Sequence, residues 1–188
     1  MNDSWRTLNL DFDPITEFYQ FPKEQKERAK YTDHVHEPQY INPEFSEWAY
    51  NLGLGITRIE RFSSNPDYRM YIHTDNADFI NNTVKIIWCY CPTDDHSMIW
   101  YDLKDPDWFE TITNNDSGGT MMFEDWNAIE KTRVTIKKPI LANVGQPHNI
   151  ENGQSYRHVI CAWFHELAKP DIDLQWEDAV YLMRDYLE

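Results

Sequence analysis

The stretch that decides the fold is Ile140-Leu-Ala-Asn-Val-Gly-Gln-Pro-His148-Asn-Ile-Glu-Asn-Gly-Gln-Ser-Tyr-Arg157-His-Val-Ile-Cys-Ala-Trp-Phe164. Two strand-like runs flank Asn152-Gly153, and this dipeptide is a strong sequence signal for a two-residue type I′ turn. Counting outward from such a turn places His148 opposite Arg157. Directly opposed residues of an antiparallel pair have Cβ atoms roughly 5 Å apart and share one face of the sheet. The sequence therefore predicts a β-hairpin that sets a histidine beside an arginine, which suggests a shared ligand.

A second polar cluster lies upstream, in the strand-like run from Tyr68 to Asp78. Residues two apart on a strand point to the same face, so His73 and Asp75 are expected to point the same way. Two histidines and one carboxylate leave the other coordination positions of a metal open, as in the facial triad of non-haem Fe(II) oxygenases. We therefore take His73, Asp75 and His148 as candidate metal ligands.

The order of these residues, a His-x-Asp pair, a distant histidine and then an arginine, all in strands, resembles a known family. It is similar to the 2-oxoglutarate- and Fe(II)-dependent dioxygenases, particularly their small phage- and bacterial-type members, over about residues 56–164. The resemblance implies a double-stranded β-helix of the jelly-roll or cupin type, with iron in the mouth of the barrel. It also implies Fe(II), 2-oxoglutarate and O2, and hydroxylation of a C–H bond coupled to decarboxylation of 2-oxoglutarate to succinate and CO2.

The resemblance also assigns roles to individual residues. His73, Asp75 and His148 would hold the iron and form the catalytic centre, and Arg157 would bind the distal carboxylate of 2-oxoglutarate through its planar guanidinium. One position departs from the pattern, because many members carry serine or threonine two residues after the arginine and this chain has Val159. Other members use a tyrosine instead, for which Tyr71 and Tyr90 are the candidates.

Composition limits the partners of this 188-residue chain. Its formal net charge of −15 argues against binding to a nucleic-acid backbone or to an anionic membrane surface. No signal peptide and no apolar run long enough to cross a bilayer stand out. Three cysteines without an export signal indicate reduced thiols, which predicts a cytoplasmic protein.

The spacing of the predicted elements indicates a mainly β protein with flanking helices, in a single domain over residues 1–188. Short strands at regular spacing are typical of a β-sandwich or barrel. A helix is expected to begin at Asn42-Pro43, where an N-cap residue precedes a first-turn proline. The clearest strand is Val84–Cys91, in which Trp88 and Tyr90 share one face while Lys85 and Cys89 share the other. Residues 105–119 are expected to form an exposed loop, and His96 is expected at the surface.

Two further functions remain open on the residues alone. One is a cupin-like metalloprotein that does not use 2-oxoglutarate, and the other is a non-catalytic β-barrel module that binds a ligand in an aromatic mouth. For the oxygenase, a peptide or protein side chain is the leading substrate, followed by a small molecule. The sequence does not decide the oligomeric state, the role of residues 1–42 or the role of residues 104–119.

Overall fold

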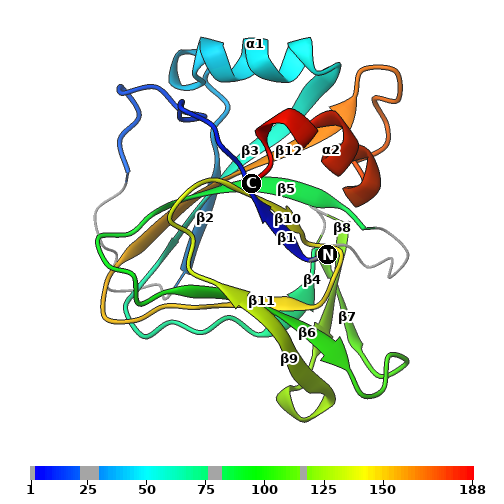
Figure 1. The fold of residues 1–188 in the computed structure, drawn as a ribbon. Helices are drawn as coiled ribbons and strands as arrows, with labels where there is room; N and C mark the ends of the chain where they lie inside the picture. Colours follow the sequence, from blue (N-terminus) through cyan, green and yellow to red (C-terminus); the bar gives the residue numbers. More distant parts are fainter. Residues whose placement is uncertain (1–2, 22–29, 76–81, 115–117) are drawn as a thin grey trace.

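Two antiparallel sheets of six strands each face one another across the interior of the protein (Figure 1). The computed structural model describes residues 3–21, 30–75, 82–114 and 118–188. The strands of the first sheet are, in spatial order, β1 (Trp5–Thr7), β10 (Ile140–Asn143), β5 (Val84–Tyr90), β12 (Arg157–Glu166), β3 (Leu54–Ser64) and β2 (Lys30–His34). Those of the second sheet are β7 (Glu110–Asn114), β8 (Gly118–Phe123), β4 (Ile72–Thr74), β11 (His148–Glu151), β6 (Ser97–Leu103) and β9 (Ala128–Val134).

Successive strands of the barrel alternate between the two sheets. The chain passes from β3 in the first sheet to β4 in the second, then to β5 and back to β6, and the same alternation links β9, β10, β11 and β12. Within these two runs, successive strands therefore lie on opposite walls, and the centre of each sheet is assembled from strands that are distant in sequence. This topology is a double-stranded β-helix, so the predicted fold class is confirmed. The hairpin β7–β8 extends the second sheet beyond β4.

Two helices cover the outer side of the first sheet (Figure 1). Helix α1 (Pro43–Asn51) begins as predicted, because the Asn42 side chain accepts a hydrogen bond from the Glu44 amide at 3.0 Å. The chain leaves α1 through Gly53, whose φ of +75° is readily adopted only by glycine. Helix α2 (Trp176–Leu182) follows the last strand. The remaining helical segments are the 3-10 turns η1 (Pro38–Tyr40), η2 (Asp125–Asn127) and η3 (Arg184–Tyr186).

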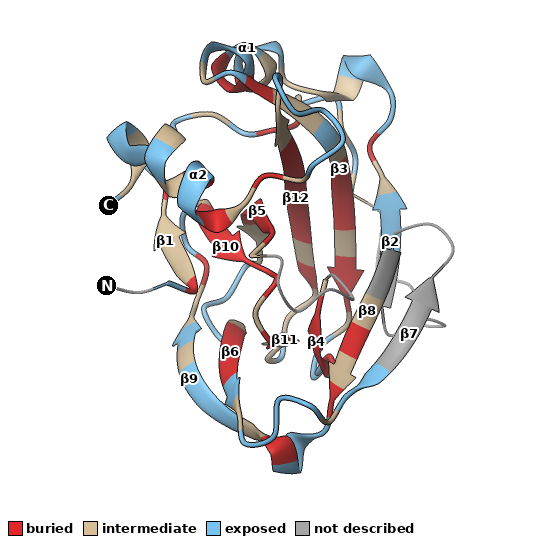
Figure 2. Ribbon diagram, turned by 90° about the vertical axis from the view of Figure 1, so that its right-hand side faces the viewer, coloured by how far each residue is buried: buried red, intermediate tan, exposed pale blue. Residues whose placement is uncertain are grey.

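Strand β5 separates two apolar layers, as the alternation of its residues predicts. Trp88 belongs to the outer layer, where Phe45 of α1 packs edge-on against it with ring centroids 5.5 Å apart. Ile87 points the other way, into the layer between the two sheets. Strands β3, β5 and β12 are accordingly buried along most of their length (Figure 2). The side chains that point inward from these strands therefore fill the space between the sheets, and the candidate site lies among them.

The predicted hairpin at Asn152-Gly153 is wrong. Strand β11 pairs with β4 and β6, whereas β12 pairs with β3 and β5, so His148 and Arg157 lie on opposite sheets. Gly153 does not have the positive φ that a type I′ turn requires. Asn152 instead donates its side-chain amide to the carbonyl of Asn65 at 2.9 Å. Tertiary contacts of this kind carry the chain from one sheet to the other in place of a tight turn.

The predicted loop at 105–119 is also wrong in part. Glu110–Asn114 forms β7, which pairs with β8 at the edge of the second sheet. Polar composition concealed this strand, because an edge strand can expose most of its side chains and need not show an apolar pattern. This region therefore adds a strand to the second sheet, which carries the candidate ligands.

No helix in the described parts of the chain could cross a bilayer. The longer of the two α-helices, α1, has only nine residues, whereas about 20 are needed to span the hydrocarbon core.

Candidate metal centre

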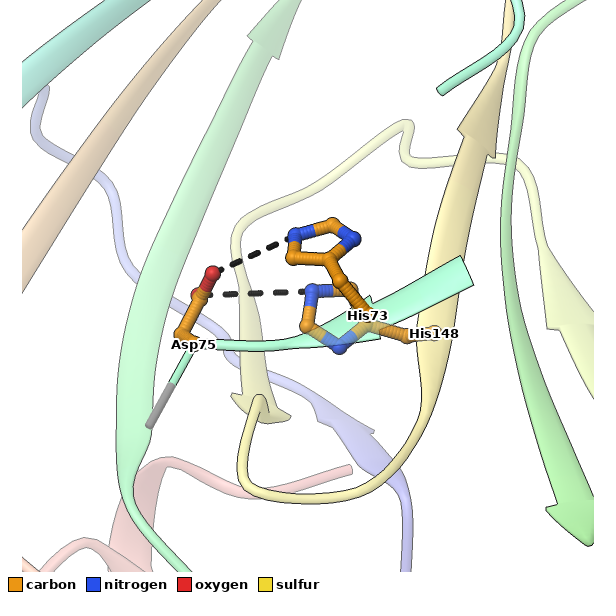
Figure 3. A group of neighbouring side chains, drawn as sticks. All are labelled: His73, Asp75 and His148. Atoms are coloured by element: carbon orange, nitrogen blue, oxygen red, sulfur yellow. Dashed lines mark ion pairs between the residues drawn. The ribbon is translucent and has the colours of Figure 1, made fainter. Parts of the chain in front are cut away.

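The second sheet holds the three candidate ligands side by side. His73 of β4 and His148 of β11 are directly opposed in register, so both imidazoles point to the same face. Asp75 follows β4 directly and reaches the same point. Its Oδ1 lies 3.3 Å from His73 Nε2, and its Oδ2 lies 4.0 Å from His148 Nε2 (Figure 3). One ligand atom from each residue lies within 4.8 Å of the others, a spacing that could hold a metal ion.

Backbone carbonyls orient both histidines. His73 Nδ1 lies 3.0 Å from the carbonyl oxygen of Tyr71, and His148 Nδ1 lies 2.9 Å from that of Gln146. A carbonyl can only accept, so each Nδ1 donates a proton to its carbonyl and Nε2 is the nitrogen that faces Asp75. Metal-binding histidines are characteristically fixed in this way, with the non-ligating nitrogen donating to a carbonyl or carboxylate.

The electrostatics of the cluster keep His148 and Asp75 in the protonation states that a metal requires. Burial, followed by the neighbouring His73, lowers the pKa of His148 to about 3, so its imidazole is neutral at physiological pH. Burial alone would raise the pKa of Asp75, but the ammonium of Lys85 and the hydrogen bond with His73 hold that pKa well below its usual range. A neutral His148 imidazole and an ionised Asp75 carboxylate therefore face one another, as metal binding requires.

Lys85 is an unpredicted member of this cluster. Its Nζ lies 2.5 Å from Asp75 Oδ2, and its side chain is only 7% exposed. Burial opposes the charge on this lysine, but the Asp75 carboxylate raises the pKa of Lys85 so that it stays protonated. The signal in the sequence was a single lysine within the apolar strand β5, on the face that points between the sheets. Such a residue is rarely buried without a charged partner.

Arg157 enters the same cavity from the opposite sheet. It is 2% exposed, and its Nε donates to Cys89 Sγ at 3.3 Å, whereas its Nη2 has no hydrogen-bond partner among the described residues. A buried guanidinium nitrogen without a partner is costly, which indicates a place for an anionic ligand. The cavity of about 50 Å³ is lined by His73, Asp75, Lys85, His148 and Arg157 together with Phe62, Met70, Ile87, Met98, Ile150, Val159 and Cys161.

The sequence pattern grouped His73, Asp75, His148 and Arg157, and the structure brings all four to one cavity. Their arrangement differs from the predicted one. His148 and Arg157 were expected as cross-strand neighbours, yet they face each other from two sheets across the cavity. The double-stranded β-helix explains this outcome, because β11 and β12 follow one another on opposite walls. Their roles as iron ligands and as an anchor for 2-oxoglutarate stay predictions.

The two candidate tyrosines lie outside the cavity. Tyr90 is on the opposite face of β5 from Lys85, and its hydroxyl donates to Asp13 at 2.8 Å, so its assignment beside Arg157 is wrong. Alternation along the strand, which sets Tyr90 with Trp88, already placed it away from the inner face. Tyr71 is 44% exposed and packs edge-on against His73, with ring centroids 5.3 Å apart. Its main contact with the cluster is the carbonyl that accepts from His73.

Cys89 and His96 form a further support that the motif did not reveal. His96 was expected at the surface, but it is 3% exposed. Its Nε2 lies 3.3 Å from Cys89 Sγ, and its Nδ1 lies 3.0 Å from the Thr93 carbonyl oxygen. Because Cys89 also accepts from Arg157, this pair fixes the orientation of the guanidinium.

The chain was compared with protein-family models, curated proteins and solved structures, and matches were found among the solved structures. No protein-family model and no curated protein matches the chain. Similar solved structures include an oxidoreductase of the 2OG-Fe(II) oxygenase family from Burkholderia pseudomallei, with 12% identity, coverage of 77% of this chain and 73% of that one, and a TM-score of 0.40. E. coli ycfD is 12% identical to this chain. The match covers 86% of this chain and 41% of ycfD, with a TM-score of 0.43. A cupin 2 domain-containing protein from Halorhodospira halophila has 10% identity, coverage of 98% and 92%, and a TM-score of 0.38.

At these identities and TM-scores, the similarities carry no argument about a reaction or a substrate. The chemistry has to be inferred from the side chains themselves. Two imidazole nitrogens and a carboxylate oxygen suit a first-row divalent ion such as Fe(II), and three ligands leave coordination positions free for other molecules. The arrangement can therefore hold a metal and, through Arg157, an anion beside it.

Proposed function

We propose that this protein is a non-haem Fe(II)- and 2-oxoglutarate-dependent oxygenase. One observation carries the proposal: the cluster of His73, Asp75 and His148 shares a buried cavity with Arg157, whose Nη2 has no partner among the described residues. A metal alone would account for the three ligands but not for the arginine. An anionic co-substrate that also approaches the metal would account for both.

The residues present fit the two groups that this reaction needs. Both Nε2 atoms are turned toward the site, because each Nδ1 is committed to a backbone carbonyl, and the Asp75 carboxylate stays ionised beside them. Such a donor set is the 2-His-1-carboxylate set of non-haem Fe(II) oxygenases. Arg157 is permanently charged and presents a planar fork that matches a carboxylate, as the distal end of 2-oxoglutarate requires.

Each residue has a defined task in this proposal. His73, Asp75 and His148 hold Fe(II), and Lys85 holds the Asp75 carboxylate in position through its ion pair with Oδ2. Arg157 binds the distal carboxylate of 2-oxoglutarate, while Cys89 orients the guanidinium from the other side. When bound, Fe(II) and 2-oxoglutarate would supply, together with O2, the oxidising chemistry for hydroxylation of a C–H bond, coupled to conversion of 2-oxoglutarate to succinate and CO2.

The apolar walls serve the same reaction by excluding water. Phe62, Ile87, Met98, Ile150 and Val159 line the cavity around the polar groups. A dry cavity strengthens the interactions between charges inside it and keeps solvent from the reacting centre. In this scheme, the substrate is a peptide or protein, and a C–H bond of one of its side chains is hydroxylated. A small molecule is the second candidate substrate.

Anaerobic titration with Fe(II) and then 2-oxoglutarate tests the proposal. We expect the weak visible charge-transfer band of an iron–2-oxoglutarate complex in the wild type, no band in His73→Ala, and a weakened band in Arg157→Ala at equal 2-oxoglutarate concentration. The exposed residues His36 and Arg184 provide matched controls, and His36→Ala and Arg184→Ala should leave the band unchanged. Iron binding without any band, at saturating 2-oxoglutarate, would overturn the proposal.

Two observations favour other functions. No hydroxyl-bearing side chain appears among the described residues that line the cavity, where many 2-oxoglutarate oxygenases would have one beside the arginine. This departure favours a cupin-like metalloprotein that does not use 2-oxoglutarate, which predicts iron binding without the band. The ion pair of Lys85 with Asp75 supplies a countercharge to the carboxylate without any metal. It favours a non-catalytic binding module, which predicts no stoichiometric iron.

A further inference from the structure

A surface groove adjoins the metal cavity along the edge of the second sheet. It has a volume of about 290 Å³ and combines apolar, aromatic and acidic side chains. Its floor comes from β4 and β8, and its far wall comes from the segment between β6 and β7. The residues that line it are Arg69, Met70, Tyr71, Ile72, Trp108, Glu110, Met122, Phe123, Glu124 and Asp125.

Sheet register ties this groove to the candidate metal ligands. His73 of β4 is opposed to Met122 of β8, and Met122 is opposed to Glu110 of β7. Directly opposed residues share a face, so all three side chains project from the same side of the sheet. Adjacent strands lie about 4.8 Å apart, which places the Glu110 backbone roughly 10 Å from that of His73. Met122 and Glu110, which line the groove, therefore lie on the same face of the sheet as His73.

Met70 forms the boundary between the two spaces. It lines both the metal cavity and the groove. Its flexible thioether side chain can change rotamer at low cost, in contrast to a branched or aromatic residue. A substrate that lies in the groove can therefore direct one end past Met70 toward the cavity.

The fixed charge of the groove is negative. Arg69, the one cation among the described residues that line it, already contacts two acids, because it donates twice to Asp125 at 2.9 and 3.2 Å and its Nε lies 3.2 Å from Glu151. Glu110 and Glu124 form no ion pair with any residue that the structure describes. Two carboxylates thus remain available, in a chain whose formal net charge is −15.

An aromatic residue, Trp108, lines the groove together with these carboxylates, and its backbone is anchored by hydrogen bonds. The buried side chain of Asn127 fixes the segment that bears Trp108, since its Nδ2 donates to the carbonyls of Asp105 at 2.8 Å and Trp108 at 3.3 Å. Its Oδ1 also accepts from the Asp105 amide at 2.8 Å. The half-exposed ring of Tyr71 lines the groove as well. Aromatic faces and carboxylates together are suited to a cation, which aromatic rings attract through their quadrupole.

We propose that this groove binds a cationic group of the substrate, either a protonated amine or a guanidinium. Glu110 and Glu124 provide the countercharges, and Trp108 provides the aromatic contact. The reacting carbon then lies on the other side of Met70, within the cavity of the metal ligands. The inference rests on the proposed oxygenase function for its chemical purpose, but binding to the groove can be measured without metal.

Nuclear magnetic resonance on the metal-free protein tests this proposal. The signal is the indole N–H of Trp108, identified by its loss in Trp108→Phe. The ligands are pentapeptides acetyl-Gly-Gly-X-Gly-Gly-amide with X as lysine, arginine, norleucine or glutamate, and the free cations butylamine and butylguanidine. We expect lysine or arginine peptides to bind at least about fivefold more tightly than norleucine, because each exposed ion pair contributes about two- to fivefold.

The acidic residues are tested by a charge-matched pair of variants. Glu110→Gln combined with Glu124→Gln should abolish the preference for the cation. Glu47→Gln combined with Glu177→Gln, on the exposed sides of α1 and α2, should preserve it. Binding of the free cations but not of the peptides would assign the groove to a small amine, whereas peptide binding alone would assign it to a side chain.

Several results separate this inference from the oxygenase proposal. Equal affinity for lysine, arginine and norleucine peptides would overturn the groove assignment, as would a preference that survives in the double glutamine variant. Neither result would affect the iron and 2-oxoglutarate titration. A clear preference for cations in a protein that binds no iron would keep the groove assignment and refute the oxygenase.

Discussion

The Nζ of Lys85 lies 2.5 Å from the Oδ2 of Asp75, in the cavity that also contains both candidate histidine ligands. The pair links the two sheets, since Lys85 belongs to β5 and Asp75 follows β4. The ammonium of Lys85 also lies next to the carboxylate that the proposed function assigns to a metal cation. Lys85 therefore both stabilises the metal-free protein and competes with a metal for the carboxylate.

We expect Lys85→Met to destabilise the metal-free protein by about 3–5 kcal/mol, because a buried carboxylate loses its partner. A divalent metal should then restore more stability in the variant than it adds to the wild type, since it replaces the missing charge. Thermal unfolding with and without Zn(II) or Mn(II) measures both effects. Lys137→Met, at an exposed ion pair with Asp94, is the control, and an equal metal-induced rise in Tm in both variants would contradict the prediction.

Cys89 should control the affinity for 2-oxoglutarate without affecting the metal. Cys89→Ala leaves the buried Arg157 Nε without its acceptor, at a cost of about 1–3 kcal/mol. We expect the 2-oxoglutarate concentration that gives half of the charge-transfer band to rise severalfold, with unchanged Fe(II) affinity. Cys89→Ser, which retains an acceptor, should recover most of the loss. Equal behaviour of the alanine and serine variants would exclude orientation of the guanidinium by this side chain.

Asn127 should matter for the groove as well as for stability. Asn127→Ala removes three hydrogen bonds from a fully buried position, so we expect the free energy of unfolding to fall by about 2 kcal/mol. Urea unfolding measures this loss, and Asn9→Ala at an exposed site is the control. The indole N–H of Trp108 should shift even in the folded variant. An unchanged signal would show that Asn127 does not hold the groove wall.

Stability of the metal-free protein should fall as the pH drops below about 6.5. Burial and His73 lower the pKa of His148 to about 3, and burial and Arg61 lower that of His158 to about 4. Both histidines bind protons more readily in the unfolded chain, where the pKa is about 6.5, so acid favours unfolding. Between its folded and unfolded pKa values, each histidine lowers the free energy of unfolding by at most about 1.4 kcal/mol for every unit by which the pH falls.

Urea unfolding from pH 7.5 to 4.5 tests this dependence. His158→Gln should flatten the curve between about pH 6.5 and 4, because it removes one of the two groups and lies away from the metal cluster. His36→Gln, at an exposed position, should leave the slope unchanged. A stability that does not change across this range would contradict the assigned pKa shifts.

Local patterns in the sequence predicted the parts of the fold that depend on neighbouring residues. Asn42 and Gly53 mark the limits of α1, and the alternation of β5 correctly sets Lys85 and Cys89 on the inner face. The fold class followed from the resemblance of the His-x-Asp, histidine and arginine order to an oxygenase family. Those features are encoded in backbone propensity and side-chain period, so they can be read without tertiary contacts.

Strand partners could not be read in the same way. The Asn152-Gly153 turn is plausible locally, but β11 is already bonded on both edges by β4 and β6, which leaves no edge for β12. The role of Lys85 likewise depends on Asp75, a residue from another strand. Pairing between distant segments is decided by the whole barrel, and no short-range signal records it.

The hairpin β7–β8 has a consequence for how such a protein can diversify. Among the described residues, its strand pairing with the rest of the second sheet is through β4, and β7 pairs only with β8. Mutations or insertions there can reshape the groove while β11 and β12, which carry His148 and Arg157, keep all their strand partners and β4, which carries His73, keeps its pairing with β11. Selection for a new substrate could therefore act on one appendage, leaving an inherited catalytic centre intact. Exchanging this hairpin between related chains would be a direct route to altered specificity.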